Sequence, residues 1–380
     1  MHTVLSFYKA TIARRGASLL AGVVAAVLLA PHSAAALEPT VPDFSLKKPG
    51  GLLDALPTDA KVLTSFGERP VFSPDGKKVA FIGESLGDAF EYDLATGVTR
   101  NLTAHTPHRG FFRVHYLPDG SYVLTGARKR GTAENERGEA EIFYLDKNAS
   151  GPIQPLDARL WEGLATARSS NTIAWAEYDD KFSFRALSPA SKVRGTLKVA
   201  DVVVSDGRAR LANIKSIASF DAMADCLFEA QDFRANDTEV IGPCYVVNKS
   251  VLEAVASGKA PWEGLLGGNR TIGVIRASGK RTEYFSTSTM YAELEGVSPD
   301  GKWALVECAK RFGAGLDLCR IELTSPASAS IRRITFAQDY GPYRYSNATI
   351  SPDARWMAFH VANAQAELGT GSGIVVAPLK

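Results

Sequence analysis

The sequence predicts an all-β protein folded as a ring of six small antiparallel sheets, and three observations lead to this prediction. A Pro-Asp turn followed by alternating apolar residues recurs four times. The repeats occupy about forty residues each, which is the length of four short strands with their turns. The last repeat lacks one strand while a strand-like segment precedes the first, so the two chain ends can complete one sheet.

The turn is seen first in FSPDGKKVAF, residues 72–81, and it returns three times, starting at Tyr116, Val297 and Ile350. Proline presets φ at the second turn position, Asp accepts a hydrogen bond from the backbone two residues further on, and Gly adopts a positive φ. Each turn therefore predicts a β-hairpin. It also predicts a structural, non-catalytic role for the turn aspartates, which are Asp75, Asp119, Asp300 and Asp353.

The first three repeats, or blades, are expected in the first half of the chain. Blade one extends from about Thr64 to Thr103, and blade two from Gly110 to about Asp157 with a long middle loop. Blade three begins at Leu160 and has lost the Pro-Asp-Gly turn. It keeps two stretches of strand character, GLATARSSNTIAWAEYD and DVVVSDGRARLANI.

The last three blades contain the cysteines and the closure of the ring. Blade four is expected to open at Ser216, with an insertion at residues 248–268 after its third strand; blades five and six begin near Ala292 and Tyr345. Blade six has three strands. Its fourth is assigned to residues 60–66, AKVLTSF, and this pairing leaves no open sheet edge.

These repeats resemble the six-bladed propellers of the TolB type, which are related to the WD-repeat class. The resemblance rests on the turns [FY]-x-P-D-G-[KR] and the A-F or A-L strand after them, and it covers most of the chain beyond residue 60. It implies a β-propeller fold and, as a function, the binding of proteins in the cell envelope. Because propellers include binding proteins and many enzymes, the fold is implied more strongly than the function.

Residues 1–36 have the composition of a secretory signal peptide. Arg14 and Arg15 precede an uncharged apolar stretch at residues 16–30, and small residues lead to a predicted cleavage site after Ala36. The apolar stretch is shorter than the ~20 residues that a membrane-spanning helix needs. We therefore expect an exported protein, periplasmic or alternatively extracellular.

After cleavage, the chain would consist of an irregular lead-in at residues 37–59 and a propeller at residues 60–380, with no membrane span. The formal net charge of +2 gives no indication of a nucleic-acid partner.

Two local disulfides are predicted, Cys226 with Cys244 and Cys308 with Cys319. Each pair is expected on two adjacent antiparallel strands, with the cysteines opposite each other and therefore within disulfide reach. Disulfides are typical of exported proteins, and the absence of a CxxC spacing argues against zinc.

Polar residues gather in the links between blades and in the middle loops, which open on the face opposite the Pro-Asp turns. His105 and His108, in the link from blade one to blade two, could bind a metal or act as acid and base. Arginine and tyrosine amid mixed charge are typical of recognition surfaces, although a solvated face of long loops would look similar. The other residues assigned to this face are Arg109, Arg128, Arg130, Asp179, Arg311, Tyr340 and Tyr343.

Two functions are compatible with these features. The first is an exported scaffold that binds a protein or peptide of the cell envelope through this face, with no cofactor and no catalytic residue. The alternative is a metal-assisted enzyme acting on carbohydrate, a lyase or hydrolase, because metal-dependent propeller lyases of pectic oligosaccharides place histidines around the central channel. The first is favoured because few histidines are present, so catalysis is not expected.

Overall fold

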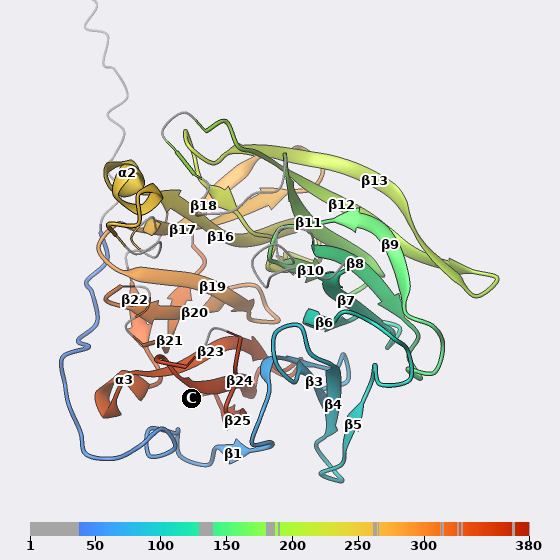
Figure 1. The fold of residues 1–380 in the computed structure, drawn as a ribbon, viewed down its shortest axis with the longest axis horizontal. Helices are drawn as coiled ribbons and strands as arrows, with labels where there is room; N and C mark the ends of the chain where they lie inside the picture. Colours follow the sequence, from blue (N-terminus) through green and yellow to red (C-terminus); the bar gives the residue numbers. More distant parts are fainter. Residues whose placement is uncertain are drawn as a thin grey trace, which may run out of the picture. The chain divides into compact units, whose positions relative to one another are not determined.

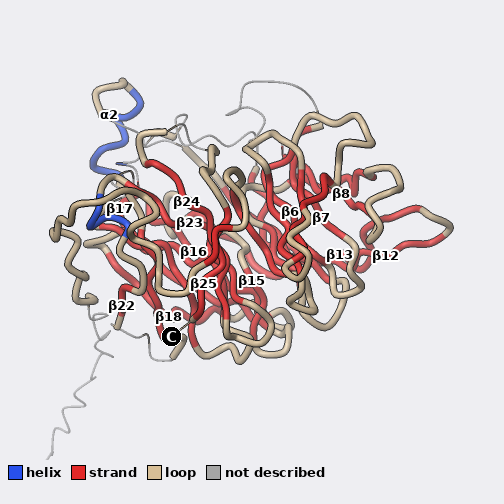
Figure 2. Tube along the Cα trace, turned by 90° about the horizontal axis from the view of Figure 1, so that it is seen from below, coloured by secondary structure: helices blue, strands red, loops and turns tan. Residues whose placement is uncertain are grey.

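The computed structural model describes residues 38–379 except 129–139, 180–186, 189–190, 261–263, 265, 312, 314, 325–326, 328–329 and 367–368. Antiparallel strands make up nearly all of the regular structure in this part of the chain (Figures 1 and 2). They form six separate sheets around a central channel, each a blade of a propeller. The predicted six-bladed fold is therefore confirmed. The predicted signal peptide lies outside the described residues.

In the first three blades, the strands pair in chain order from the channel outward. Blade one consists of β2 (Glu68–Phe72), β3 (Lys78–Ile82), β4 (Ala89–Asp93) and β5 (Thr99–Asn101). Blade two consists of β6 (Phe111–Tyr116), β7 (Tyr122–Ala127), β8 (Ala140–Leu145) and β9 (Gln154–Arg159). Blade three consists of β10 (Leu164–Thr166), β11 (Thr172–Tyr178), β12 (Arg194–Ser205) and β13 (Arg208–Asp221).

Blades four and five contain the cysteines. In blade four, two short inner strands both pair with the next one. The strands are β14 (Leu227–Phe228), β15 (Asp232–Arg234), β16 (Glu239–Val247), β17 (Leu266–Ile275) and β18 (Arg281–Thr287). A short helical segment, η2 (Lys249–Val251) and α2 (Leu252–Ala256), follows β16. Blade five consists of β19 (Tyr291–Val297), β20 (Trp303–Ala309), β21 (Asp317–Glu322) and β22 (Ile331–Arg333).

Blade six follows the short helix α3 (Ala337–Tyr340) and closes the ring. It consists of β23 (Tyr343–Ile350), β24 (Trp356–Asn363), β25 (Ile374–Pro378) and β1 (Lys61–Val62). The outermost strand, β1, pairs with β25, with Lys61 opposite Val376 and Val62 opposite Val375. The predicted closure by the N-terminal segment is confirmed, although only two of residues 60–66 form ladder pairs.

The boundary between blades three and four differs from the expectation. Residues 216–221, expected to open blade four, belong to the end of β13 in blade three. The reason is that β12 and β13 form one long hairpin that extends past the neighbouring blade (Figure 1). Gln154 of β9 anchors its tip, because its side-chain amide donates to Gly207 O at 3.0 Å and accepts from Ala209 N at 3.0 Å. As a result, the insertion of blade four follows β16, the second strand outward from the channel, and not the third strand as expected.

The Pro-Asp turns have the chemistry predicted for them. In the first, Asp75 Oδ1 accepts from Ser73 Oγ at 2.6 Å and from Lys77 N at 3.1 Å. Equivalent bonds hold Asp300 and Asp353, whereas Asp119 accepts from both the backbone N and the hydroxyl of Ser121. These aspartates are therefore held by turn hydrogen bonds.

The lead-in segment packs on the outside of blades five and six. Val41 and Phe44 contact the core of blade five, and Leu52 and Leu56 that of blade six. Polar contacts reinforce this packing: Lys48 pairs with Asp339 at 3.4 Å, and the hydroxyl of Tyr345 donates to Leu52 O at 2.5 Å. The segment thus covers apolar side chains of two blades.

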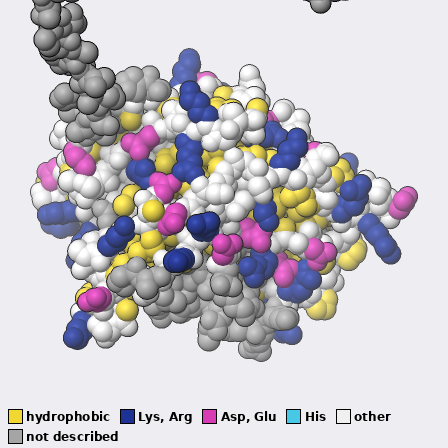
Figure 3. All heavy atoms as spheres, turned by 90° about the horizontal axis from the view of Figure 1, so that it is seen from above, with side chains coloured by type: hydrophobic (Ala, Val, Ile, Leu, Met, Phe, Trp, Pro, Cys, Tyr) yellow, Lys and Arg dark blue, Asp and Glu magenta, His cyan; other side chains and the backbone are white. Residues whose placement is uncertain are grey.

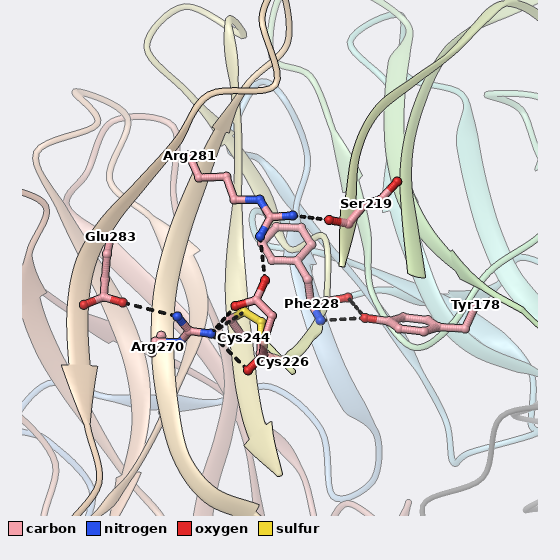
Figure 4. Close-up of a disulfide and its surroundings, with 9 residues drawn as sticks. Tyr178, Ser219, Cys226, Phe228, Cys244, Arg270, Arg281 and Glu283 are labelled. Atoms are coloured by element: carbon pink, nitrogen blue, oxygen red, sulfur yellow. Dashed lines mark hydrogen bonds and ion pairs between the residues drawn. A yellow bond between two sulfur atoms is a disulfide. The ribbon is translucent and has the colours of Figure 1, made fainter. Parts of the chain in front are cut away.

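Both predicted disulfides are present, with Cα–Cα distances of 5.4 Å for Cys226–Cys244 (Figure 4) and 5.8 Å for Cys308–Cys319. The paired cysteines are diagonal neighbours, not directly opposite: Cys319 lies opposite Val306, and Cys244 opposite Phe228. Figure 4 shows Arg270 and Arg281 close to the first disulfide, where both donate to Asp225 at 2.5 Å. All four sulfurs belong to fully buried residues, so the bridges are part of the core.

Candidate functional site

The central channel is lined by the innermost strand of every blade and contains two cavities. The lower cavity, about 350 Å³, opens among the Pro-Asp turns, with Pro74 and Pro352 at its rim. The upper cavity, about 380 Å³, opens among the interblade links and middle loops. Arg69, Arg113 and Asn347 line both, so they mark the level where the two cavities meet. Cavities of this size accept a small ligand or one side chain of a partner.

The backbone is irregular at this level. The inner strands of blades one, two, five and six all carry a register shift, within β2, β6, β19 and β23. Arg69 and Asn347 adopt positive φ values of 53° and 50°. Positive φ in residues other than glycine is strained and clusters at functional sites, as do β-bulges, which redirect side chains. The channel level marked by Arg69, Arg113 and Asn347 is therefore the candidate functional site.

Three carboxylates of blade five converge at this site. Glu293 and Glu295 lie two residues apart on β19 and so share one face, and Glu307 of β20 lies directly opposite Glu293. Their ligand oxygen atoms all lie within 4.8 Å of one another. Like charges directly opposite in an antiparallel pair destabilise a sheet, so this cluster opposes the stability of blade five.

The hydrogen bonds of this cluster require a shared proton. The hydroxyl of Tyr245 lies 2.9 Å from a carboxylate oxygen of Glu229 and 2.5 Å from one of Glu293. One hydroxyl proton serves one acceptor, so the other contact needs a proton on a carboxyl group. Tyr291 also donates to Glu293.

The environment favours the protonated form of these acids. Burial, followed by the charges of Glu307 and Glu293, raises the pKa of Glu295 well above 4.5. Burial and the charges of Glu307 and Glu229 likewise raise the pKa of Glu293 well above 4.5. Burial also raises the pKa of Glu307, although a hydrogen bond from Asn347 N at 2.8 Å opposes this effect. The cluster therefore favours protons or another cation.

Arginine side chains lie on the other blades of the channel. Arg113 of blade two donates to Glu229 Oε1 at 2.8 Å; burial disfavours its charge, but the charges of Glu229 and Glu295 raise its pKa overall. Arg69 of blade one and Arg344 of blade six also line the upper cavity. The arginines of blades six, one and two therefore line the upper cavity together with acids of several blades, among them Glu68 beside Arg69.

Apart from guanidinium Nε atoms, two buried polar atoms of the upper cavity have no hydrogen-bond partner. They are Oγ of Ser346 on β23 and Nδ1 of His360 on β24, and these residues are 4% and 5% exposed. The two residues lie opposite each other in the ladder. Burial, the first of several causes, lowers the pKa of His360 to about 4, so the ring is neutral and Nδ1 can accept or bind a ligand.

The residues predicted from sequence lie around the channel and not in it. The strand order places the links and middle loops at the end of the blades where the upper cavity opens, as predicted. His105, Arg109, Arg128, Asp179 and Arg311 are exposed. Of the predicted residues that the structure describes, none lines either cavity. Arg130 falls outside the described residues.

Several of these residues are engaged in local contacts. His105 Nε2 lies 2.8 Å from Gly151 O. His108 Nε2 lies 2.8 Å from Asp88, and its Nδ1 accepts from Gly110 N at 2.9 Å, so both ring nitrogens are occupied. Arg128 pairs with Asp157 at 2.8 Å.

The two predicted tyrosines are partly buried. Tyr340 and Tyr343 pack against the core of blade six. Their apolar contacts belong to the fold, and no contact described for them reaches the channel cavities.

Sequence reasoning missed the residues that do line the channel, but a signal was present. The segment YAELEGVSPDG places Glu293 and Glu295 on alternate positions of a strand directly before a Pro-Asp turn. That turn identifies the strand as the innermost one of its blade, and period-two alternation then predicts that both acids face the same side. That Glu307 joins these two acids could be predicted only by knowing which residues of β19 and β20 lie opposite each other.

One further motif is present, GESLG at residues 83–87, which has the Gly-x-Ser-x-Gly spacing of a nucleophile elbow. In the structure this segment joins β3 to β4, whereas an elbow joins a strand to a helix. Ser85 Oγ donates to Glu68 at 2.6 Å. The motif therefore lacks the structural context of a hydrolase nucleophile.

Charges of both signs are interspersed over the side of the molecule seen in Figure 3, with no extended patch of one sign. Among the residues described, no helix is long and apolar enough to span a membrane.

No protein-family model and no curated protein matches the sequence. Among solved structures, TolB from Acinetobacter baumannii is similar at 9% identity and a TM-score of 0.47; the match covers 81% of this chain and 65% of the TolB chain, less than two thirds of its length. Oligogalacturonate lyase from Vibrio parahaemolyticus is similar at 11% identity and a TM-score of 0.44, over 86% of this chain and 93% of the lyase. A luciferin-regenerating enzyme is similar at 10% identity and a TM-score of 0.49, over 83% and 94%. These likenesses concern the fold alone. At that level, the chain is a six-bladed β-propeller.

Proposed function

We propose that this protein is an exported binding propeller that recognises a protein or peptide of the cell envelope at the face where the upper cavity opens. The observation that carries the proposal is the charged upper cavity, which both arginines and carboxylates line. Its strained floor residues, Arg69 and Asn347, support a role in binding, because such strain persists where it is functional.

The dimensions of the cavity favour a peptide segment or a single side chain over a folded domain. A volume of about 380 Å³ admits a few residues at most. Exposed arginines on the surrounding loops, Arg109 and Arg311 among them, could contact the remainder of a partner. Two disulfides support an oxidising compartment, and hence export.

The proposal is tested by site-specific photocrosslinking. A benzoylphenylalanine is placed at position 311 in the middle loop of blade five, and a matched one at position 302 in the Pro-Asp turn of the same blade. Both native residues, Arg311 and Lys302, are exposed, and they lie at opposite ends of the blade. In an envelope extract we expect one discrete adduct from position 311 and none from position 302.

Two controls decide the result. Excess unlabelled protein should suppress the adduct, and Arg344→Gln should reduce it at least tenfold, as expected for a lost charge-assisted contact in the cavity. Equal labelling from both positions, or none from position 311, would exclude the upper face as the binding site.

The alternative, a metal-assisted enzyme acting on carbohydrate, has its own test. Pectic oligosaccharides are incubated with the protein and Mn²⁺, and the products are separated by chromatography. Cleavage that disappears in the His108→Gln variant would favour this alternative. The contacts of both His108 ring nitrogens give it less support than the cavity gives to partner binding.

A further inference from the structure

We propose that Glu293, Glu295 and Glu307 form a binding site for one divalent metal ion inside the channel. The inference goes beyond the proposed partner binding. Glu293 and Glu307 line the same upper cavity, but the metal site is tested with the ion alone and without a partner.

The three side chains have the geometry of a chelating set. They come from adjacent positions of two paired strands, and their ligand oxygens lie within 4.8 Å of one another. Oxygen ligands of Ca²⁺ stand about 2.3–2.6 Å from the ion, so any two of them lie within roughly 5 Å of each other. The cluster can therefore surround one ion without a large rearrangement of the backbone.

A second and independent observation points to a missing ligand. Ser346 and His360 are buried, they line the upper cavity together with Glu293 and Glu307, and Ser346 Oγ and His360 Nδ1 have no partner. Buried polar atoms without a partner are rare because they lose the hydrogen bonds that water provided. A bound ion with its remaining water ligands would satisfy both atoms.

The charge around the cluster is also incomplete. Elsewhere in the protein, the buried carboxylate of Glu91 forms ion pairs with Lys78 and Arg100, both at 2.9 Å. It also accepts hydrogen bonds from two tyrosine hydroxyls. Among the described residues, neither Lys nor Arg lies within ion-pair distance of the three acids. The charges of Arg113 and Arg344 act on them from further away, and Arg113 pairs with Glu229. A buried carboxylate needs a proton or a cation, and three together need more than one proton.

The chemistry of the donors identifies the class of metal. Carboxylates and a hydroxyl are hard oxygen ligands, which suit Ca²⁺, Mg²⁺ or Mn²⁺. Gln231 and Asn347 donate to Glu295 at 2.7 and 3.2 Å and would hold that carboxylate in place when the ion binds. Both disulfides remain outside this set, so no thiolate competes for the ion.

Titration calorimetry with CaCl₂, MgCl₂ and MnCl₂, each alone, tests the site in the full chain after removal of metals with EDTA. We expect one ion per chain for at least one of the three metals, with a Kd below about 10⁻³ M. Glu295→Gln and Glu307→Gln should each weaken that binding at least tenfold. Glu253→Gln, which removes the same charge from an exposed position on α2, should leave the Kd unchanged.

Proton release provides a readout that a surface site would not give. Because metal ions bind the deprotonated carboxylates, binding should release protons at any pH where the metal-free acids hold them, and the heat should then change between buffers of different ionisation enthalpy. The absence of saturable binding of all three metals up to 1 mM would overturn the proposal. Binding that persists in both Glu295→Gln and Glu307→Gln would overturn it as well. Circular dichroism confirms that the variants are folded, and the crosslinking at position 311 tests partner binding separately.

Discussion

Glu295 makes the stability of the protein depend on pH. Because burial and the charges of Glu307 and Glu293 raise its pKa well above 4.5, the folded protein keeps a proton that the unfolded chain releases. The resulting stabilisation is complete below about pH 4.5 and is lost as the pH rises through the folded pKa. Each such proton changes the free energy of unfolding by up to ~1.4 kcal/mol per pH unit.

We predict that Glu295→Gln flattens this dependence in metal-free protein. Urea unfolding at pH 5, 6.5 and 8 should show the variant gaining stability over the parent as the pH rises. His360, with its lowered pKa, acts in the opposite direction below pH 6.5, but it does so equally in both proteins. A variant that lost stability as steeply as the parent would show that Glu295 is ionised in the folded state.

The hairpins were the most predictable elements. The four turns were found from sequence because their chemistry is local: Ser73 and Asp75 are two residues apart and bond to each other. Even the degenerate turn of blade six keeps this geometry, and there Ala354, with φ 59°, stands in place of the usual glycine. A local motif of this kind needs no knowledge of the remainder of the chain.

The features that were missed depend on long-range contacts. Residues 216–221 alternate as any strand does, and only the extended pairing of β13 with β12 assigns them to blade three. The channel site has the same difficulty: Glu229 and Glu293 are far apart in sequence and meet through the hydroxyl of Tyr245. The predicted histidines were more conspicuous in the sequence, but their loops surround the cavity without lining it.

The Cys308–Cys319 disulfide is expected to stabilise blade five by linking β20 to β21. The bridge closes a loop with a sequence separation of 11 residues, which corresponds to about 3 kcal/mol in the loop-entropy account. We predict that the double variant Cys308→Ala/Cys319→Ala unfolds in urea with a free energy lower by about this amount.

The same comparison under a strong reductant is the control. Both proteins then lack this bridge and also the Cys226–Cys244 bridge. The difference between their free energies of unfolding should therefore shrink to the effect of replacing two cysteine side chains by alanine on core packing. A difference that stayed the same with and without reductant would mean that packing, and not the covalent link, provides the stabilisation.

The whole propeller depends on the closure of its ring, which a few backbone contacts provide. Beside the two-residue pairing of β1 with β25, Leu63 N donates to Ile374 O at 2.7 Å, and Ile374 N donates to Thr64 Oγ1 at 3.1 Å. Gly67 and Ser372 form a further bridge. At Gly371 the two segments approach so closely that a Cβ atom would lie 1.8 Å from Gly67 O.

We predict that Gly371→Ala separates these segments and destabilises the entire molecule, by about 2 kcal/mol or more, since the obstacle is backbone that must move. Thermal unfolding should show one transition at a lower midpoint, and hydrogen exchange at the Leu63 and Ile374 amides should accelerate. Gly51→Ala is the matched control: a Cβ there would meet no atom closer than 3.8 Å, so its midpoint should stay near that of the parent. If Gly371→Ala and the parent unfolded at the same temperature, closure by the chain ends would not limit stability, and the six blades would hold together by their side-to-side packing alone.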